Sequence, residues 1–131
     1  MDGGIIVEGF VHGYSNILKI LNIYAPYNKI LKFWVGIFQS GILANMSLIV
    51  VGDFNFMMSN QGIWGDVKSE DSLTYFFTAK FEEMKLVDVV PNVMIPTWSN
   101  GRCRGVGLAK WLDEFFLAKN LCEDFGKYNS W

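Results

Sequence analysis

The residues best suited to chemistry follow an apolar run near the middle of the chain. Leu48-Ile49-Val50-Val51 leads directly into Gly52-Asp53-Phe54-Asn55. A buried strand that ends in a small polar turn can present an acid and an amide at the edge of an α/β sheet. Asp53 could orient or deprotonate a water, or contact a metal ion, while Asn55 could donate to a phosphate oxygen. A plain turn stabilised by the aspartate side chain is the competing interpretation.

Hydrophobic spacing around this turn predicts two helices and several strands. Apolar residues recur at helical intervals from about Lys29 to Leu43 and from Ser72 to Met84. Turn residues at 12–16 lie between two β-rich runs, which predicts a hairpin. The expected strands are Ile5 to Val11, Ile17 to Tyr24, Met46 to Val51, Leu86 to Val90, Met94 to Ser99 and Ala109 to Leu117, with a loop from Phe56 to Asp71 and a short turn or helix from Asn120 to Phe125.

The order of these elements predicts the fold class and the position of the polar residues. Hairpins beside a strand–helix–strand unit favour a mixed-sheet α/β (α+β) β-sandwich flanked by helices over a Rossmann fold. Tyr24 and Asp53 each follow or end a strand, and one helix separates the two strands. Because such crossovers join parallel strands, we expect both side chains at the same edge of the sheet, together with Asn55 and Asp113.

Composition narrows the class of protein. The 131 residues are enough for one domain with a real core, and 51% of them are hydrophobic. No apolar stretch approaches the roughly 18 residues of a membrane span, so we expect no membrane association. Two cysteines without metal spacing fit reduced thiols, and we expect an intracellular protein, nuclear or cytoplasmic. A net charge of −2 argues against holding nucleic acid by bulk charge alone, although a local groove that uses a divalent cation remains open.

Four motifs occur in an order that matches a known family. They are Asn22-Ile23-Tyr24-Ala25-Pro26, Gly52-Asp53-Phe54-Asn55, Thr97-Trp98-Ser99-Asn100-Gly101-Arg102 and Leu112-Asp113-Glu114-Phe115-Phe116-Leu117. From about Val7 to Trp131 the chain resembles the endonuclease/exonuclease/phosphatase superfamily. More narrowly, it resembles the apurinic-type endonuclease domain of plant LINE-type (non-LTR) retrotransposons. The resemblance implies a four-layer DNase-like fold, of which residues 1–131 would be a central fragment.

The resemblance also implies a role for each matching residue near the turn. Tyr24 would hydrogen-bond the scissile phosphate, and Asp53 would position or activate the attacking water and contact a metal. Asn55 would bind phosphate or a metal-linked oxygen. Asp113 would orient a catalytic histidine. Without the resemblance, a strand-end tyrosine, two turn residues and a surface aspartate would explain the same positions.

Further residues are implied to contact DNA, which is the partner that the resemblance implies, with Mg²⁺ as cofactor. Trp98 would pack at the floor of the DNA-binding face, although core packing is the alternative for a strand tryptophan. Asn100 and Arg102 would reach DNA phosphates, although a solvated turn explains them equally well.

The chain also departs from the family pattern. The catalytic histidine of the family lies in a downstream Ser-Asp-His motif, and the main metal-binding glutamate and an early asparagine lie upstream. These residues contain neither the downstream histidine motif nor the upstream glutamate and asparagine. The one histidine present, His12, is expected in an exposed hairpin turn. Trp111 and Glu114 stand where the family often has arginine. Since catalytic groups act as a unit, we expect little activity from this fragment, whose ancestral reaction would be Mg²⁺-dependent hydrolysis of DNA phosphodiester bonds.

Three alternatives remain at this point. The chain could be a non-catalytic module that binds nucleic acid or protein, or a non-functional remnant of a degenerate element. A phosphatase acting on inositol phosphates or lipids is a weaker enzyme alternative, and the segment from Thr97 to Arg102 favours the nuclease branch. Because a partial sandwich exposes sheet edges and apolar faces, we also expect self-association.

Overall fold

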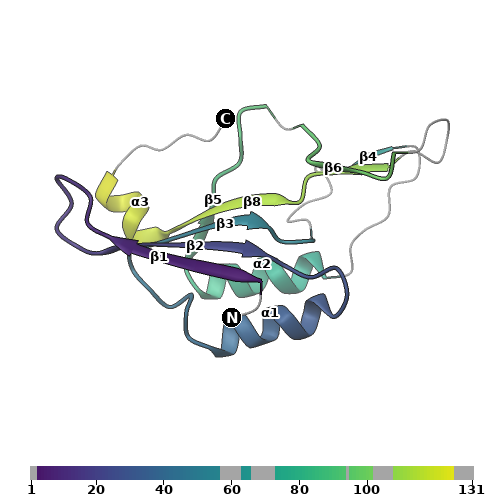
Figure 1. Cartoon of the computed structure of the whole chain (residues 1–131). Coiled ribbons are helices and arrows are strands. Elements are labelled where there is room, and N and C mark those ends of the chain that lie inside the picture. Colours follow the sequence, from purple (N-terminus) through teal and green to yellow (C-terminus); the bar gives the residue numbers. More distant parts are fainter. Residues whose placement is uncertain (1–2, 57–62, 66–72, 94, 102–107, 126–131) are drawn as a thin grey trace.

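The main sheet has five strands and mixed direction (Figure 1). The computed structural model describes residues 3–56, 63–65, 73–93, 95–101 and 108–125. In spatial order the strands are β1 (Gly4–Gly9), β2 (Leu18–Tyr24), β3 (Leu48–Asp53), β8 (Asp113–Ala118) and β5 (Leu86–Asp88). Strands β2 and β3 pair in parallel, and the other three pairings are antiparallel. The predicted mixed sheet is therefore confirmed, and so is the hairpin that β1 and β2 form.

Two helices cover one face of this sheet (Figure 1). They are α1 (Ile30–Gln39) and α2 (Thr74–Glu83), both within the predicted ranges. Helix α1 begins after Lys29, which adopts a left-handed backbone with φ of 60°, and it ends four residues earlier than predicted. A third helix, α3 (Lys119–Phe125), continues directly from β8. None of the helices in the described ranges is long and apolar enough to cross a bilayer.

A second, three-stranded sheet lies beyond the end of the main sheet at which β3 ends (Figure 1). Its order is β4 (Ile63–Gly65), β7 (Leu108–Lys110) and β6 (Trp98–Ser99). Strand β4 falls in the stretch predicted as a loop, and the strand predicted from Ala109 to Leu117 is divided into β7 and β8. The division has a clear cause, because the Leu112 N–H donates to the Thr97 hydroxyl while its carbonyl accepts from Phe54 N–H.

The core is an aromatic cluster centred on one tryptophan. Trp34 of α1 is fully buried, and its ring centroid lies 4.9 Å from that of Phe54. Its indole N–H donates to the Phe54 carbonyl at 3.2 Å, which satisfies a buried polar group. The other rings in contact with Trp34 come from both helices and the segment after β3: Phe33, Phe38, Phe56, Phe77 and Phe81. This packing fixes the turn after β3 against the helix layer.

The opposite face of the main sheet is apolar but open in the described residues. Side chains alternate along each strand, so the register assigns each one to a face. Leu21, Val50 and Phe116 share the helix-covered face and are buried. Ile5 and Val7 of β1 lie on the other face and are 67% and 57% exposed. The exposed apolar face also carries the polar residues described next.

Candidate functional site

Three predicted site residues occupy matching positions on three neighbouring strands. Tyr24 of β2 pairs in register with Asp53 of β3, and Asp53 pairs with Asp113 of β8. Paired residues point to the same side of a sheet, so all three side chains share the open face at one end. The prediction that Tyr24 and Asp53 lie at one edge of the sheet is confirmed. Tyr24 is 71% exposed and therefore accessible to a ligand.

The backbone around Asp53 is unusually constrained. Gly52 has φ of 128°, and a Cβ atom there would lie 1.9 Å from the Ile23 carbonyl oxygen. Only glycine fits this close approach of β2 and β3. After the turn, Asn55 adopts a left-handed backbone with φ of 54°, which asparagine tolerates better than most residues. The Gly-Asp-Phe-Asn motif is therefore explained by its geometry.

Hydrogen bonds give the turn residues a structural role. The Asn55 N–H donates to the Asp53 carboxylate at 2.9 Å, which closes an Asx turn. The Asn55 side-chain amide donates to the Ala25 carbonyl, and Ala25 N–H donates to the Asp53 carbonyl at 2.8 Å. These bonds join the end of β2 to the end of β3 and hold Tyr24 and Asp53 in place. The predicted contact of Asn55 with phosphate stays a prediction.

The Asp53 carboxyl group is electrostatically suited to accept a proton. Partial burial raises its pKa above the usual value, the Asn55 N–H lowers it, and the negative charge of Asp113 raises it again. A carboxylate with a raised pKa is a stronger base than an ordinary aspartate. This property agrees with the predicted role of Asp53 in positioning or activating water, which remains a prediction.

Asp113 is held in place by a residue that sequence reasoning did not single out. The Thr97 hydroxyl oxygen accepts from Leu112 N–H at 3.0 Å and from Asp113 N–H at 3.4 Å. Thr97 N–H in turn donates to the Lys110 carbonyl at 3.0 Å. The threonine that begins the Thr-Trp-Ser-Asn motif therefore positions the acid of the Leu-Asp motif. The order of the two motifs was a signal, but their contact was visible only in the fold.

The predicted DNA-contact residues lie on and beside the second sheet. Trp98 is 43% exposed, so the alternative of core packing is wrong. It pairs with Lys110 of β7, a cation that the sequence analysis missed. Asn100 is half-buried in the turn after β6, and Arg102 lies outside the described residues. An exposed aromatic residue paired in register with a lysine is a combination that suits contacts with bases and phosphates.

Two other residues named in the sequence analysis, one on β8 and one between β1 and β2, do not join the site. Glu114 is buried and pairs in register with Gly52, so it belongs to the helix-covered face. Glu114, which stands where the family often has arginine, therefore does not lie on the open face that carries Asp53 and Asp113. His12 lies exposed between β1 and β2, as predicted. It is at the far end of β2 from Tyr24, on the order of 20 Å away for seven strand residues.

A magnesium site is only partly supported by this geometry. Asp53 and Asp113 provide two carboxylates, whereas Mg²⁺ prefers six oxygen ligands in octahedral arrangement. The part of the chain that the structure describes contains no group of three or more histidine, cysteine or acidic residues able to hold a metal. Among the described residues, Asp53 and Asp113 therefore do not form a complete metal centre by themselves.

The main sheet with helices on one face defines an α/β protein, and its fold matches that of a DNase-like endonuclease domain of known structure. Among solved structures, the chain is similar to the endonuclease domain of TRAS1, a telomere-specific non-LTR retrotransposon, with a TM-score of 0.69 and 16% identity. The match covers 92% of this chain and 52% of that one, so the chain spans about half the length of its structural relative. No family profile and no curated protein matches the sequence. The likeness establishes the fold, while the narrower plant LINE assignment remains a prediction.

Proposed function

We propose that the chain is part of a retrotransposon-type endonuclease domain whose ancestral reaction is metal-dependent hydrolysis of DNA phosphodiester bonds. One observation carries this proposal. Tyr24, Asp53 and Asp113 occupy paired positions on three neighbouring strands of a DNase-like sheet. A tyrosine hydroxyl can donate to a phosphate oxygen, and a carboxylate beside it can orient water toward phosphorus. The plant LINE-type origin belongs to this proposal as its narrower form.

We further propose that these 131 residues alone do not cleave DNA. Phosphodiester hydrolysis needs stabilisation of the developing negative charge and a group that handles the proton. The described site supplies two carboxylates and a phenol, and the only histidine, His12, lies at the other end of β2. Because catalytic groups act as a unit, an incomplete set gives little residual rate.

The remaining function of the chain is then binding of nucleic acid at the same edge. Trp98 and Lys110 lie opposite each other in the second sheet, and Thr97 connects that sheet to Asp113. Stacking on an exposed aromatic ring and contact of a cation with phosphate would give weak binding that depends on salt. This binding function is our second candidate, and it requires no catalysis.

A nicking assay combined with a binding assay tests both candidates. The purified chain is incubated with supercoiled plasmid and Mg²⁺, and we expect no nicking above background. Binding to a short DNA duplex should weaken as salt rises, with Lys110→Ala and Arg102→Ala reducing it and Asp53→Asn leaving it intact. Nicking that Asp53→Ala abolishes would show that the chain is an active enzyme. Absence of binding, together with absence of nicking, would contradict the binding function and leave a non-functional remnant of an endonuclease domain.

A further inference from the structure

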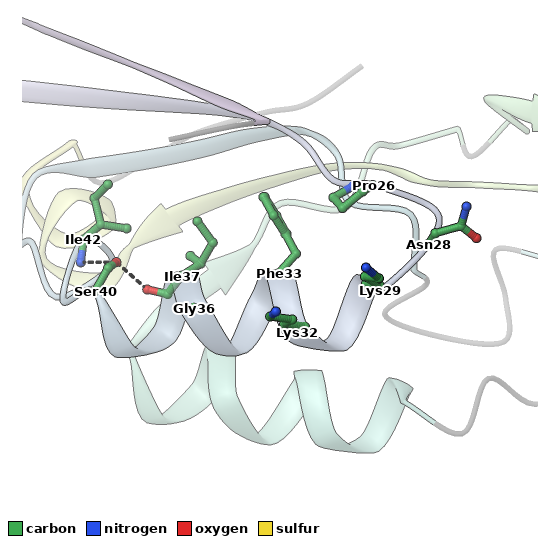
Figure 2. A pocket seen from close by; sticks show the side chains of 9 residues that line it. All are labelled: Pro26, Asn28, Lys29, Lys32, Phe33, Gly36, Ile37, Ser40 and Ile42. Carbon is green, nitrogen blue, oxygen red and sulfur yellow. Dashed lines mark hydrogen bonds between the residues drawn. The ribbon is translucent and has the colours of Figure 1, made fainter.

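An apolar groove runs along α1, from the segment that follows β2 at Pro26 to Ile42 beyond the end of the helix. Its volume is about 580 Å³, and Figure 2 shows Phe33 and Ile37 pointing from α1 toward it, with Ile42 at its far end. Ile37 is buried, while Phe33 and Ile42 are half-buried. The groove therefore has an apolar floor built from one helix face and the segment that follows the helix.

The two ends of the groove differ in charge. At one end, Ser40 donates to the Ile37 carbonyl at 2.6 Å and accepts from Ile42 N–H at 3.3 Å, so its hydroxyl is already engaged. At the other end lie Lys29 and Lys32, neither of which forms an ion pair within the described residues. The first turn of α1 also lacks a side-chain cap, and the positive end of the helix dipole lies there.

The middle of the groove is open to the helix backbone. Gly36 lines it, and a Cβ atom built on Gly36 would have no other atom within 4 Å. A glycine at such a position lets another backbone approach closely, as small residues do where helices cross. It also provides a point at which a larger side chain would fill the groove without a clash inside the protein.

We propose that this groove binds an amphipathic helix of a protein partner, with acidic residues at the end that meets Lys29 and Lys32. Helix α1 has 10 residues, so the groove matches about three turns, or about 15 Å, of a bound helix. Lys32, Gly36 and Ser40 are exposed along its length, so the ligand must keep one face in water. An amphipathic helix meets that requirement, and its apolar stripe fits the floor.

This inference is independent of the proposed DNA-directed function. The groove lies along α1 and the segment that precedes it, whereas Tyr24 and Asp53 lie on the face of the main sheet that the helices leave open. Gly36→Leu, in the middle of the helix, should therefore leave DNA binding unchanged. Failure of one proposal would not decide the other.

A selection from a display library of 16-residue amphipathic peptides tests the proposal. The wild-type chain is the target, and a Gly36→Leu variant serves for counter-selection. We expect enriched peptides to combine apolar residues at helical spacing with Asp or Glu at one end. The proposal would be overturned if no peptide bound the wild-type chain in preference to the Gly36→Leu variant. Enrichment of peptides without acidic residues would overturn it as well.

Affinity measurements with one enriched, labelled peptide then separate the contributions. Gly36→Leu should weaken binding by about tenfold or more, while the matched control Gly36→Ala should stay within about threefold. Lys32→Glu should weaken binding by a similar factor, and a peptide with lysine in place of the acidic residues should recover it. Equal binding to wild type and Gly36→Leu would contradict the proposal. If dodecanoate bound in the groove and no peptide did, the helix proposal would be wrong and the ligand would be a small amphipathic anion.

Discussion

Asp53 and Asp113 are directly opposite each other across the antiparallel pairing of β3 and β8. The negative charge of Asp113 is one of the causes that raise the pKa of Asp53, after burial. Like charges at facing positions are unfavourable in a plain structural sheet. This facing pair supports our proposal that one ligand or reaction uses both carboxylates.

Asp113→Asn should lower the pKa of Asp53 while leaving it above the usual value. The substitution removes the repulsive charge, but the burial that contributes most remains. The pKa is measured by NMR titration of the side-chain carboxyl carbon. Asp88→Asn is the matched control, because Asp88 lies on the other face of the sheet and should not affect Asp53. An unchanged Asp53 titration in Asp113→Asn would contradict this coupling.

Asp88 should make the protein less stable as pH rises. Burial raises the pKa of Asp88 to about 6, so the folded state holds a proton more tightly than the unfolded chain does. The stabilising contribution of the protonated Asp88 is complete below pH 3.8, which is the pKa of the group in the unfolded chain. It is lost as pH rises through about 6, the pKa in the folded state.

The test is urea unfolding across this pH window with wild type and Asp88→Asn. The asparagine variant should be more stable at pH 7 by about 1 kcal/mol, after allowance for the solvent that still reaches the half-buried carboxyl group. The difference should shrink at acid pH. A variant less stable than wild type at neutral pH would contradict the prediction.

Gly52→Ala should destabilise the protein by about 3 kcal/mol or more, because its Cβ atom would clash with the Ile23 carbonyl and its φ is positive. Thermal unfolding provides the measurement. Gly36→Ala is the matched control in an open helix position, where alanine should add about 0.5 to 1 kcal/mol of stability. Equal melting temperatures for wild type and Gly52→Ala would show that β2 and β3 are not held so closely.

Thr97→Val should cost about 1 to 2 kcal/mol, because the Leu112 and Asp113 N–H groups lose their acceptor. Thr97→Ser keeps the hydroxyl oxygen and serves as the control. Amide hydrogen exchange at Leu112 and Asp113 is the specific readout, and it should become faster in the valine variant alone. Equal exchange rates in the valine and serine variants would show that the Thr97 hydroxyl does not hold Leu112 and Asp113 in place.

The open face of the main sheet should cause self-association. Ile5 and Val7 expose apolar surface on the edge strand β1, which also offers unpaired backbone groups. Analytical ultracentrifugation should show a sedimentation coefficient that rises with protein concentration. The double substitution Ile5→Lys and Val7→Lys should reduce this dependence. A wild-type chain that sediments as a monomer throughout would contradict the prediction.

The sequence by itself predicted the elements that depend on local pattern. Helical spacing identified α1 and α2, because an amphipathic helix must bury one stripe wherever it packs. The crossover between two apolar strands predicted that Tyr24 and Asp53 share an edge, since short connections of this kind join parallel neighbours. The turn at Gly52 was visible from its residue types, although the competing Asx-turn interpretation also proved correct in its hydrogen bonds.

The tertiary structure decided what depends on residues far apart in the chain. The break between β7 and β8 follows from the hydrogen bonds that Leu112 makes with Thr97 and Phe54. Apolar spacing carries no sign of these long-range bonds, and it therefore predicted one strand there. The exposure of Trp98 and the burial of Glu114 were likewise set by register, which turns a side chain from one face to the other with a shift of one residue. Local patterns specify strands and helices, whereas long-range pairing determines which of their side chains meet.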